Sequence, residues 1–211
     1  MSRAAARSAS ASARKRAAVL DAATRLFLES GYAATSMEQV AAAAGVAKQT
    51  LYNQFGSKEA LFRAIVEELV RELVGPLAHA AARGEPERVL HAFGSRFMDL
   101  MLRPTSLALH RLLVAEANRI PELAHEVFES GPAQAVHALA TWLRTQVAHG
   151  QLTVSEPALA AEQFLGMLTG HIQLRALFGV CERPDAAALD AAVTHAVETF
   201  LAAHRVRPRV L

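Results

Sequence analysis

The stretch from Lys48 to Phe55 gathers hydrogen-bonding and aromatic groups on one side of a short segment. Leu51 and Phe55 stand four residues apart, which places both on the same face of a helix. The side chains left to point outward are Lys48, Gln49, Thr50, Tyr52 and Asn53. A helix with such a polar outer face can enter the major groove of DNA, where the amide of Gln49 could pair with adenine through two hydrogen bonds.

A preceding helix and a tight turn must hold this face in position. The apolar residues that predict this helix recur at three- and four-residue spacing: Met37, Val40, Ala41 and Ala44. Gly45 is expected to end it, and two short helices joined by a glycine turn form a helix-turn-helix. Its start is marked by two alternative capping boxes, Thr35 with Glu38 or Ser36 with Gln39.

A third helix is entered at Ser57, and Lys58 places a cation in its first turn. The helix dipole disfavours a cation there by about 0.3 to 1 kcal/mol. A nearby phosphate would reverse that sign, whereas a solvated Lys58 compensated by Glu59 needs no phosphate. Local physics leaves both interpretations open.

With these residues in view, the segment GYAATSMEQVAAAAGVAKQTLYNQFGSKEALF, Gly31 to Phe62, resembles the DNA-binding signature of the TetR/AcrR family of bacterial transcriptional regulators. The match is ungapped, and it assigns roles residue by residue. It implies phosphate contacts for Thr35 and Ser36, backbone contacts for Lys48, Tyr52 and Lys58, and an approach to base edges for Gln49 and Thr50. Ala47 departs from the Ser often found there, which removes a possible helix N-cap and phosphate contact.

The charge of the chain supports a partner with phosphates at one end. Of the 211 residues, residues 1–60 carry a net charge of +4, and the remainder carries −2. The basic end is the end with the motif, as expected if that end contacts double-stranded DNA. The lone Cys181 indicates a reducing cytoplasm, and no apolar run is expected to reach the length of a membrane span.

The fold is expected to be all-α, with no period-two strands. Residues 1–13, an Ala/Ser/Arg stretch, are predicted to be a disordered basic arm. The helix-turn-helix DNA-binding domain is predicted over residues 14–60, a helical regulatory and dimerisation domain over 61–205, and a disordered tail over 206–211. A linker helix joins the two domains, and Gly75 with Pro76 is expected to end it.

About five further helices are predicted, punctuated by prolines. One begins near Pro86, and the longest is expected to begin with Ser155 as N-cap and Pro157 in the first turn. The segment from about Pro104 to Gly179 resembles the regulatory domain of AefR-like members of the family. That resemblance implies control of efflux or transport genes.

Signals of an enzyme are missing from the sequence. No two of the nine His lie within five residues of each other, so no helical two-histidine metal pair can form. The Gly56-Ser57-Lys58 triplet lacks the upstream glycine of a P-loop, and there is no nucleophile elbow. We therefore expect no catalytic residues, no metal and no cofactor.

The family resemblance implies a small-molecule cavity among the helices of the regulatory domain. The residues proposed for it are Phe97, Met101, Leu112, Glu116, Trp142, Met167, His171 and Phe178. His171 is the strongest single polar candidate, because large apolar residues surround it in the sequence. Each aromatic or Met residue taken alone is more often core than pocket.

The last two long helices are expected to form the dimer interface, since in the family these helices pair with their copies. The residues predicted for it are Phe164, Leu168, Ile172, Val193, Val197 and Phe200. Dimerisation has a physical purpose, because one short recognition helix reads few bases.

The sequence therefore predicts a homodimeric, ligand-responsive repressor, released from a palindromic operator by a small hydrophobic effector and with no membrane partner. The alternatives are a regulator or architectural DNA-binding protein without a ligand, and an enzyme that has reused the scaffold.

Overall fold

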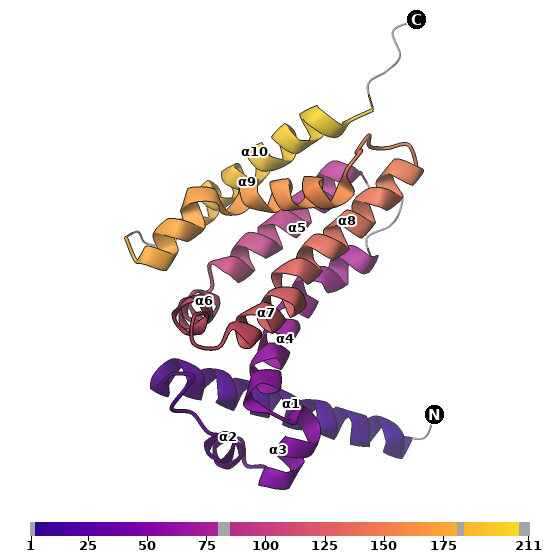
Figure 1. Ribbon diagram of the computed structural model, residues 1–211. Coiled ribbons are helices and arrows are strands. Elements are labelled where there is room, and N and C mark those ends of the chain that lie inside the picture. The colour runs from indigo at the N-terminus through magenta and orange to yellow at the C-terminus, as the bar shows by residue number, and fades with distance from the viewer. Residues whose placement is uncertain (1–2, 80–84, 181–183, 207–211) are drawn as a thin grey trace, which may run out of the picture. The chain divides into compact units, whose positions relative to one another are not determined.

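The computed structural model describes residues 3–79, 85–180 and 184–206, and within them it contains ten helices and no strand (Figure 1). The helices are α1 (Arg3–Ser30), α2 (Met37–Ala44), α3 (Lys48–Phe55), α4 (Lys58–His79), α5 (Pro86–Met101), α6 (Pro104–Glu116), α7 (Pro121–Ser130), α8 (Pro132–Ala148), α9 (Pro157–Phe178) and α10 (Ala186–His204). The all-α prediction is confirmed. Leu152 and Arg205 form an isolated antiparallel bridge.

The chain divides into two compact units, and their boundary differs from the predicted one. The first unit joins residues 1–68 with 111–130, and the second joins 69–110 with 131–211. The second half of α6 and all of α7 therefore belong with the DNA-binding helices. One contact behind this grouping is the ion pair between Arg63 on α4 and Glu126 on α7, at 3.1 Å.

Helix α1 begins at Arg3, where the sequence predicted a disordered arm over residues 1–13. Alanine and arginine have high intrinsic helix propensities, so an Ala/Arg-rich stretch can extend a helix that is already nucleated. Met1 and Ser2 lie outside the described residues, as do residues 207–211 of the predicted tail and Cys181.

Helix α4 continues through Gly75 and Pro76, where the sequence predicted its end. A proline inside a helix costs about 3 kcal/mol, because it removes one backbone hydrogen bond and crowds the preceding turn. Leu73 and Leu77 are both buried in the core of the second unit. Their burial stabilises by about 1.5–3 kcal/mol each, which offsets the cost of Pro76.

Helix α9 also differs from the prediction in two places. Its N-cap is Glu156 rather than Ser155, and no side chain caps it. At Gly170 the backbone leaves helical geometry, with φ 35° and ψ −133°, so α9 consists of two segments joined at a kink. Glycine lacks a Cβ and adopts this conformation readily, so the kink depends on Gly170.

The second unit is built around close contact of α5 with α9 and α10. Gly94 on α5 makes this contact possible, because a Cβ there would lie 3.0 Å from Val193 Cγ1 and 3.3 Å from Leu168 Cδ2. Phe164 and Phe200 pack edge to face between α9 and α10, with ring centroids 5.3 Å apart. A single apolar core, to which α4, α5, α8, α9 and α10 contribute, holds this unit together.

We predict that alanine substitution changes the stability differently at two helical glycines, because their surroundings differ. Gly75→Ala should stabilise by about 0.5–1 kcal/mol, because a Cβ there meets no atom within 4 Å. Gly94→Ala makes the same gain in helix propensity but crowds Val193 and Leu168, which costs about 1–3 kcal/mol. Urea denaturation of both variants measures the difference, and equal gains at the two sites would contradict the packing argument.

Candidate nucleic-acid interface and ligand pocket

The first helix of the motif, α2, has well-defined caps at both ends. Ser36 is the N-cap: its hydroxyl accepts from the Gln39 backbone N–H at 3.2 Å, and the Gln39 side chain accepts from the Ser36 N–H at 2.7 Å. The structure thus selects the Ser36 box from the two alternatives. Gly45 ends the helix in the left-handed conformation, with φ 64°, as the sequence predicted.

The second helix of the motif, α3, carries the polar outer face. Leu51 and Phe55 are buried, and the five outward residues of the sequence analysis are all exposed, with Tyr52 at 36%. Gln49 Nε2 donates to Asn53 Oδ1 at 2.8 Å, one turn further along. Ala47 is the N-cap residue and provides no side-chain hydrogen bond, which confirms the expectation from its missing hydroxyl.

Lys48 forms an ion pair with Glu38, which links the exposed ends of α3 and α2. Their hydrogen bond raises the pKa of Lys48 and lowers the pKa of Glu38. Lys48 Nζ also lies 5.6 Å from the centroid of the Tyr52 ring. A phosphate that binds Lys48 must therefore compete with Glu38, a residue that the sequence analysis treated only as a capping candidate.

Lys58 has internal partners that neither of the two interpretations left open by the sequence included. Its ammonium donates to the backbone carbonyls of Tyr32 at 2.9 Å and Thr35 at 3.0 Å, with Ala33 further away at 3.4 Å. It also lies 4.5 Å from the centroid of the Tyr32 ring, within the range of a cation–π interaction. These internal contacts hold the connection between α1 and α2, and the phosphate contact of Lys58 stays a prediction.

Thr35, one of the residues predicted to contact phosphate, is held by internal hydrogen bonds. Its side chain is only 2% exposed, and its hydroxyl donates to the carbonyls of Gly31 at 2.8 Å and Leu26 at 3.1 Å. The Thr35 hydroxyl is thus engaged within the chain, and its phosphate contact stays a prediction. Thr35 fastens the end of α1 to the start of α2. Ser36 is less buried, but its hydroxyl is engaged in the N-cap.

Three aromatic rings form the centre of the first unit. The ring centroids of Phe27, Tyr32 and Phe62 lie 5.4 to 5.7 Å apart, and each ring is almost completely buried. The Tyr32 hydroxyl donates to Glu59 Oε1 at 3.1 Å. Burial, reinforced by the Glu59 carboxylate, raises the pKa of Tyr32 far above its usual value, so the phenol stays protonated. Tyr32 thus connects α1 to α4.

The residues predicted to bind a ligand differ in their burial and are divided between the two units. Phe97 and Trp142 are buried in the core of the second unit, and Met101 packs against that core. Leu112 and Glu116 belong to the first unit, where Glu116 forms an ion pair with Arg119. Met167, His171 and Phe178 are exposed on α9, and Phe178 reaches 71%. Neighbours in sequence on a helix point in different directions, so the apolar residues around His171 do not bury it.

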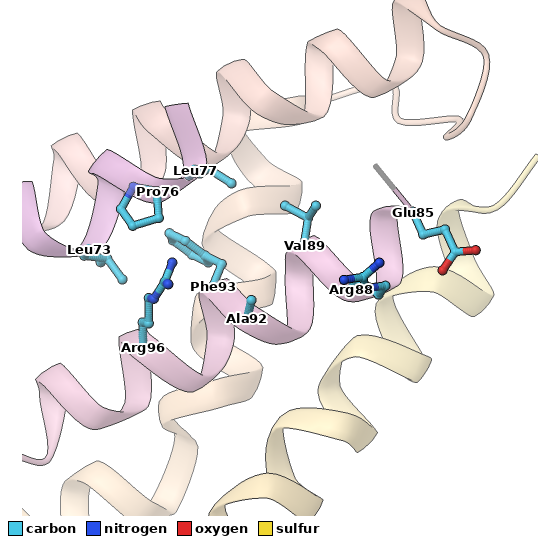
Figure 2. Close-up of a pocket in the computed structure, with 9 residues that line it drawn as sticks. All are labelled: Leu73, Pro76, Leu77, Glu85, Arg88, Val89, Ala92, Phe93 and Arg96. Atoms are coloured by element: carbon cyan, nitrogen blue, oxygen red, sulfur yellow. The ribbon is translucent and has the colours of Figure 1, made fainter. Parts of the chain in front are cut away.

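A pocket of about 260 Å³ lies in the second unit between the end of α4 and the start of α5 (Figure 2). Its apolar lining is formed by Leu73, Pro76, Leu77, Val89, Ala92 and Phe93. The exposed residues Glu85, Arg88 and Arg96 complete the lining. Sequence analysis did not predict any of these residues as pocket residues. Helix periodicity shows which side chains are apolar, but not where their packing leaves a cavity.

Most of the residues predicted for the dimer interface are buried within a single chain. Phe164, Leu168, Val193, Val197 and Phe200 are each at most 3% exposed within a single chain, and Ile172 is half-buried. In this structure these side chains pack within the chain, and their contact with a second copy stays a prediction. The most apolar stripes of α9 and α10 face each other and α5, because burial within the chain comes first for the strongest apolar face.

No cluster of three or more His, Cys, Asp or Glu in the described ranges could hold a metal ion. One described helix, α10, is long and apolar enough by length and composition to cross a membrane. This corrects the expectation that no apolar run approaches that length. The evidence for a membrane is weak, because a core helix of a soluble protein has the same properties, and Leu189, Val193 and Val197 of α10 are buried in the core.

A helix-turn-helix with a polar recognition helix, joined to a separate helical unit, defines a DNA-binding transcriptional regulator. The chain belongs to the TetR family of bacterial transcriptional regulators. Residues 19–65 match the profile of bacterial regulatory proteins of the tetR family, and residues 88–206 match that of the C-terminal domain of AefR-like transcriptional repressors. Relatives in this family are regulators and not enzymes.

Two solved structures resemble this chain over nearly its whole length. One, from Mesorhizobium loti MAFF303099, is described as a TetR-family transcriptional regulator; it is 31% identical, covers 92% of this chain and 98% of its own, and has a TM-score of 0.75. The other is the Flavonoid-responsive Regulator FrrA, which is 32% identical over 93% of this chain and 100% of its own, with a TM-score of 0.71.

Curated relatives resemble this chain over shorter stretches. The HTH-type transcriptional repressor ComR of Escherichia coli is 44% identical over 55 residues, which is 26% of each chain. The regulator RutR of the same species is 41% identical over 71 residues, or 34% of this chain and 33% of its own. The match thus spans about a quarter to a third of the length of these relatives.

We predict opposite effects from the two members of the Lys48–Glu38 ion pair. Lys48→Ala should weaken DNA binding on all sequences and reduce the slope of log K against log salt by about one. Glu38→Gln should tighten binding at low salt and keep the wild-type slope, because Lys48 no longer has to leave a carboxylate. Fluorescence anisotropy with labelled DNA at several salt concentrations measures both.

Glu29→Gln is the matched control for Glu38→Gln, since it removes the same charge from an exposed position in the same unit. If Glu29→Gln tightens binding as much as Glu38→Gln, the effect is one of net charge and the ion pair plays no specific part. An unchanged salt slope in Lys48→Ala would count against a phosphate contact by Lys48.

Proposed function

We propose that this chain is a homodimeric, ligand-responsive transcriptional repressor that binds a palindromic operator and is released by a small hydrophobic molecule. The observation that carries the proposal is the course of α4. Its first turns belong to the DNA-binding unit, and its last turns provide Leu73, Pro76 and Leu77 to the wall of the pocket (Figure 2). One continuous helix thus serves both the DNA-binding unit and the pocket.

This arrangement supports a mechanism based on two conformations. A ligand that contacts Leu73 and Leu77 stabilises the conformation of α4 that accommodates it. If that conformation holds the two recognition helices at the wrong separation for successive major grooves, the ligand lowers affinity for the operator. The size of the effect equals the difference in ligand affinity between the two states.

The proposed dimer interface is the exposed stripe of α9, together with the exposed face of α10. On α9 the exposed apolar residues are Leu159, Met167, Leu174 and Phe178, with Gly166 and Gly170 between them. On α10 the corresponding face carries small residues such as Ala187, Ala191 and Ala202. Small residues allow helices to approach closely, so the two helices and their copies could form a four-helix contact.

The relatives support the direction and the type of signal. The AefR-like profile describes repressors, and FrrA is described as flavonoid-responsive. We therefore propose a hydrophobic effector, with flavonoids as the first compounds to try, and control of efflux or transport genes. A regulator of this kind acts where the chromosome is, in the cytoplasm.

A single aspartate should test the interface. Phe178→Asp is expected to convert the dimer to monomer at micromolar concentration without unfolding the chain, because the Phe178 side chain is largely exposed. Phe128→Asp makes the same change at an exposed position on α7 and should leave the dimer intact. Sedimentation velocity measures the oligomeric state. A dimeric Phe178→Asp variant would show that Phe178 is not part of the dimer interface.

The regulatory function is tested by titrating the protein against DNA from upstream of its own gene, at two salt concentrations, with random DNA as competitor. We expect competitor-resistant binding as a dimer. Hydrophobic compounds that raise the melting temperature, as any ligand of the folded state must, should release this DNA. Binding that resists competition but responds to no compound would favour the alternative regulator without a ligand. Equal binding to both DNAs would contradict the proposal that the upstream DNA contains a specific operator.

A further inference from the structure

Helix α8 carries two buried polar side chains whose hydrogen bonds are unaccounted for. Gln146 is 0% exposed, and neither its amide oxygen nor its amide nitrogen has a hydrogen-bond partner among the described residues. The indole nitrogen of Trp142, one turn earlier on the same buried face, also has none. Buried polar groups are nearly always paired, so this pair calls for an explanation.

A third side chain, that of Gln151, adds an unpaired atom at the same end of α8. The backbone N–H of Gln151 donates to the carbonyl of Gln146 at 3.0 Å, and the side-chain oxygen of Gln151 is buried without a partner. The unpaired groups at this end of α8 therefore include N–H donors from Trp142 and Gln146 and carbonyl acceptors from Gln146 and Gln151.

The core that contains Trp142 is apolar. Trp142 belongs to the same buried cluster as Leu73, Leu77 and Phe93, which also line the pocket between α4 and α5. Within the described residues, no charged side chain is buried, and Gln146 is the one buried polar residue of the second unit. An anion here would lose its hydration without gaining a counter-ion, which is strongly unfavourable.

We propose that Trp142 and Gln146 bind the polar group of the effector, and that this effector is an uncharged, mainly apolar molecule with a hydroxyl group. This inference rests on the proposed function and names the class of its ligand. A hydroxyl oxygen can accept from the Trp142 or Gln146 N–H, while its proton is donated to an amide oxygen of Gln146 or Gln151. An ether or ketone leaves those amide oxygens without a donor, and a carboxylate adds a buried charge.

The test uses the full-length protein and three probes of similar length: 1-octanol, 1-methoxyheptane and octanoate. Trp142 is the only tryptophan in the chain, so its fluorescence reports directly on this site. We expect 1-octanol to change the Trp142 emission and raise the melting temperature. The ether should bind about tenfold more weakly or worse, since it cannot donate a hydrogen bond, and octanoate should not bind here.

A variant separates hydrogen bonding from packing. Gln146→Leu keeps a similar volume without the amide, so it should remain folded but bind 1-octanol at least about tenfold more weakly, because the hydroxyl loses its partner. Gln134→Leu makes the same change at an exposed position on α8 and should bind as the wild type does. Unchanged affinity in Gln146→Leu would show that Gln146 is satisfied by an internal water, which overturns the proposal.

Other outcomes would contradict the proposed ligand site or ligand class. The regulatory function is tested separately, by the DNA titration. If 1-octanol fails to bind, or if octanoate binds in a way that depends on Arg88 or Arg96, the ligand site is not the one proposed. The DNA titration is then repeated with compounds that do bind. Release of operator DNA in both wild type and Gln146→Leu would keep the repressor function and reject this site. Binding of 1-octanol at Trp142 without any effect on DNA would reject the repressor function alone.

Discussion

The position of the recognition helix depends on one cation, the ammonium of Lys58. From the start of α4 it reaches back to three backbone carbonyls between α1 and α2 and covers the Tyr32 ring. Hydrogen bonds to a charged group contribute about 1.5–3 kcal/mol each, more than neutral ones. Below the ammonium, the rings of Phe27, Tyr32 and Phe62 join α1 to α4. With both ends of the motif fixed, α3 presents a defined face.

Lys48, the second cation of the motif, also has an internal partner in this structure. Lys48 is held by Glu38, and the Gln49 amide is held by Asn53. If Lys48 and Gln49 contact DNA as predicted, binding exchanges these internal partners for phosphates and bases, and the net gain in free energy is smaller than a count of contacts would imply. Such an exchange favours discrimination between DNA sites, because a poorly matched site does not compensate for the internal contacts that are lost.

In the second unit, packing decides what remains for ligands and partners. The strongest apolar stripes of α9 and α10 are used inside the chain, and Gly94 lets α5 approach both helices closely. The weaker stripe that contains Leu174 and Phe178 stays exposed and is available to a second copy. The α4–α5 pocket and the unpaired groups of α8 lie in the same unit, which gives its core a polar end rather than a uniform apolar filling.

The sequence by itself determined the helical fold, the family and the local structure of the motif. Gly45 and the buried pair Leu51 and Phe55 are set by neighbours within one or two turns, so periodicity and capping rules suffice. Of the two capping boxes that the sequence allowed, the structure selected the one at Ser36. Tertiary structure decided the partners of Thr35 and Lys58, the burial of Phe164 and Phe200, and the exposure of His171. Each of these depends on segments distant in sequence. An amphipathic pattern shows that a helix has an apolar face, but only packing determines whether that face meets the core, a ligand or another chain.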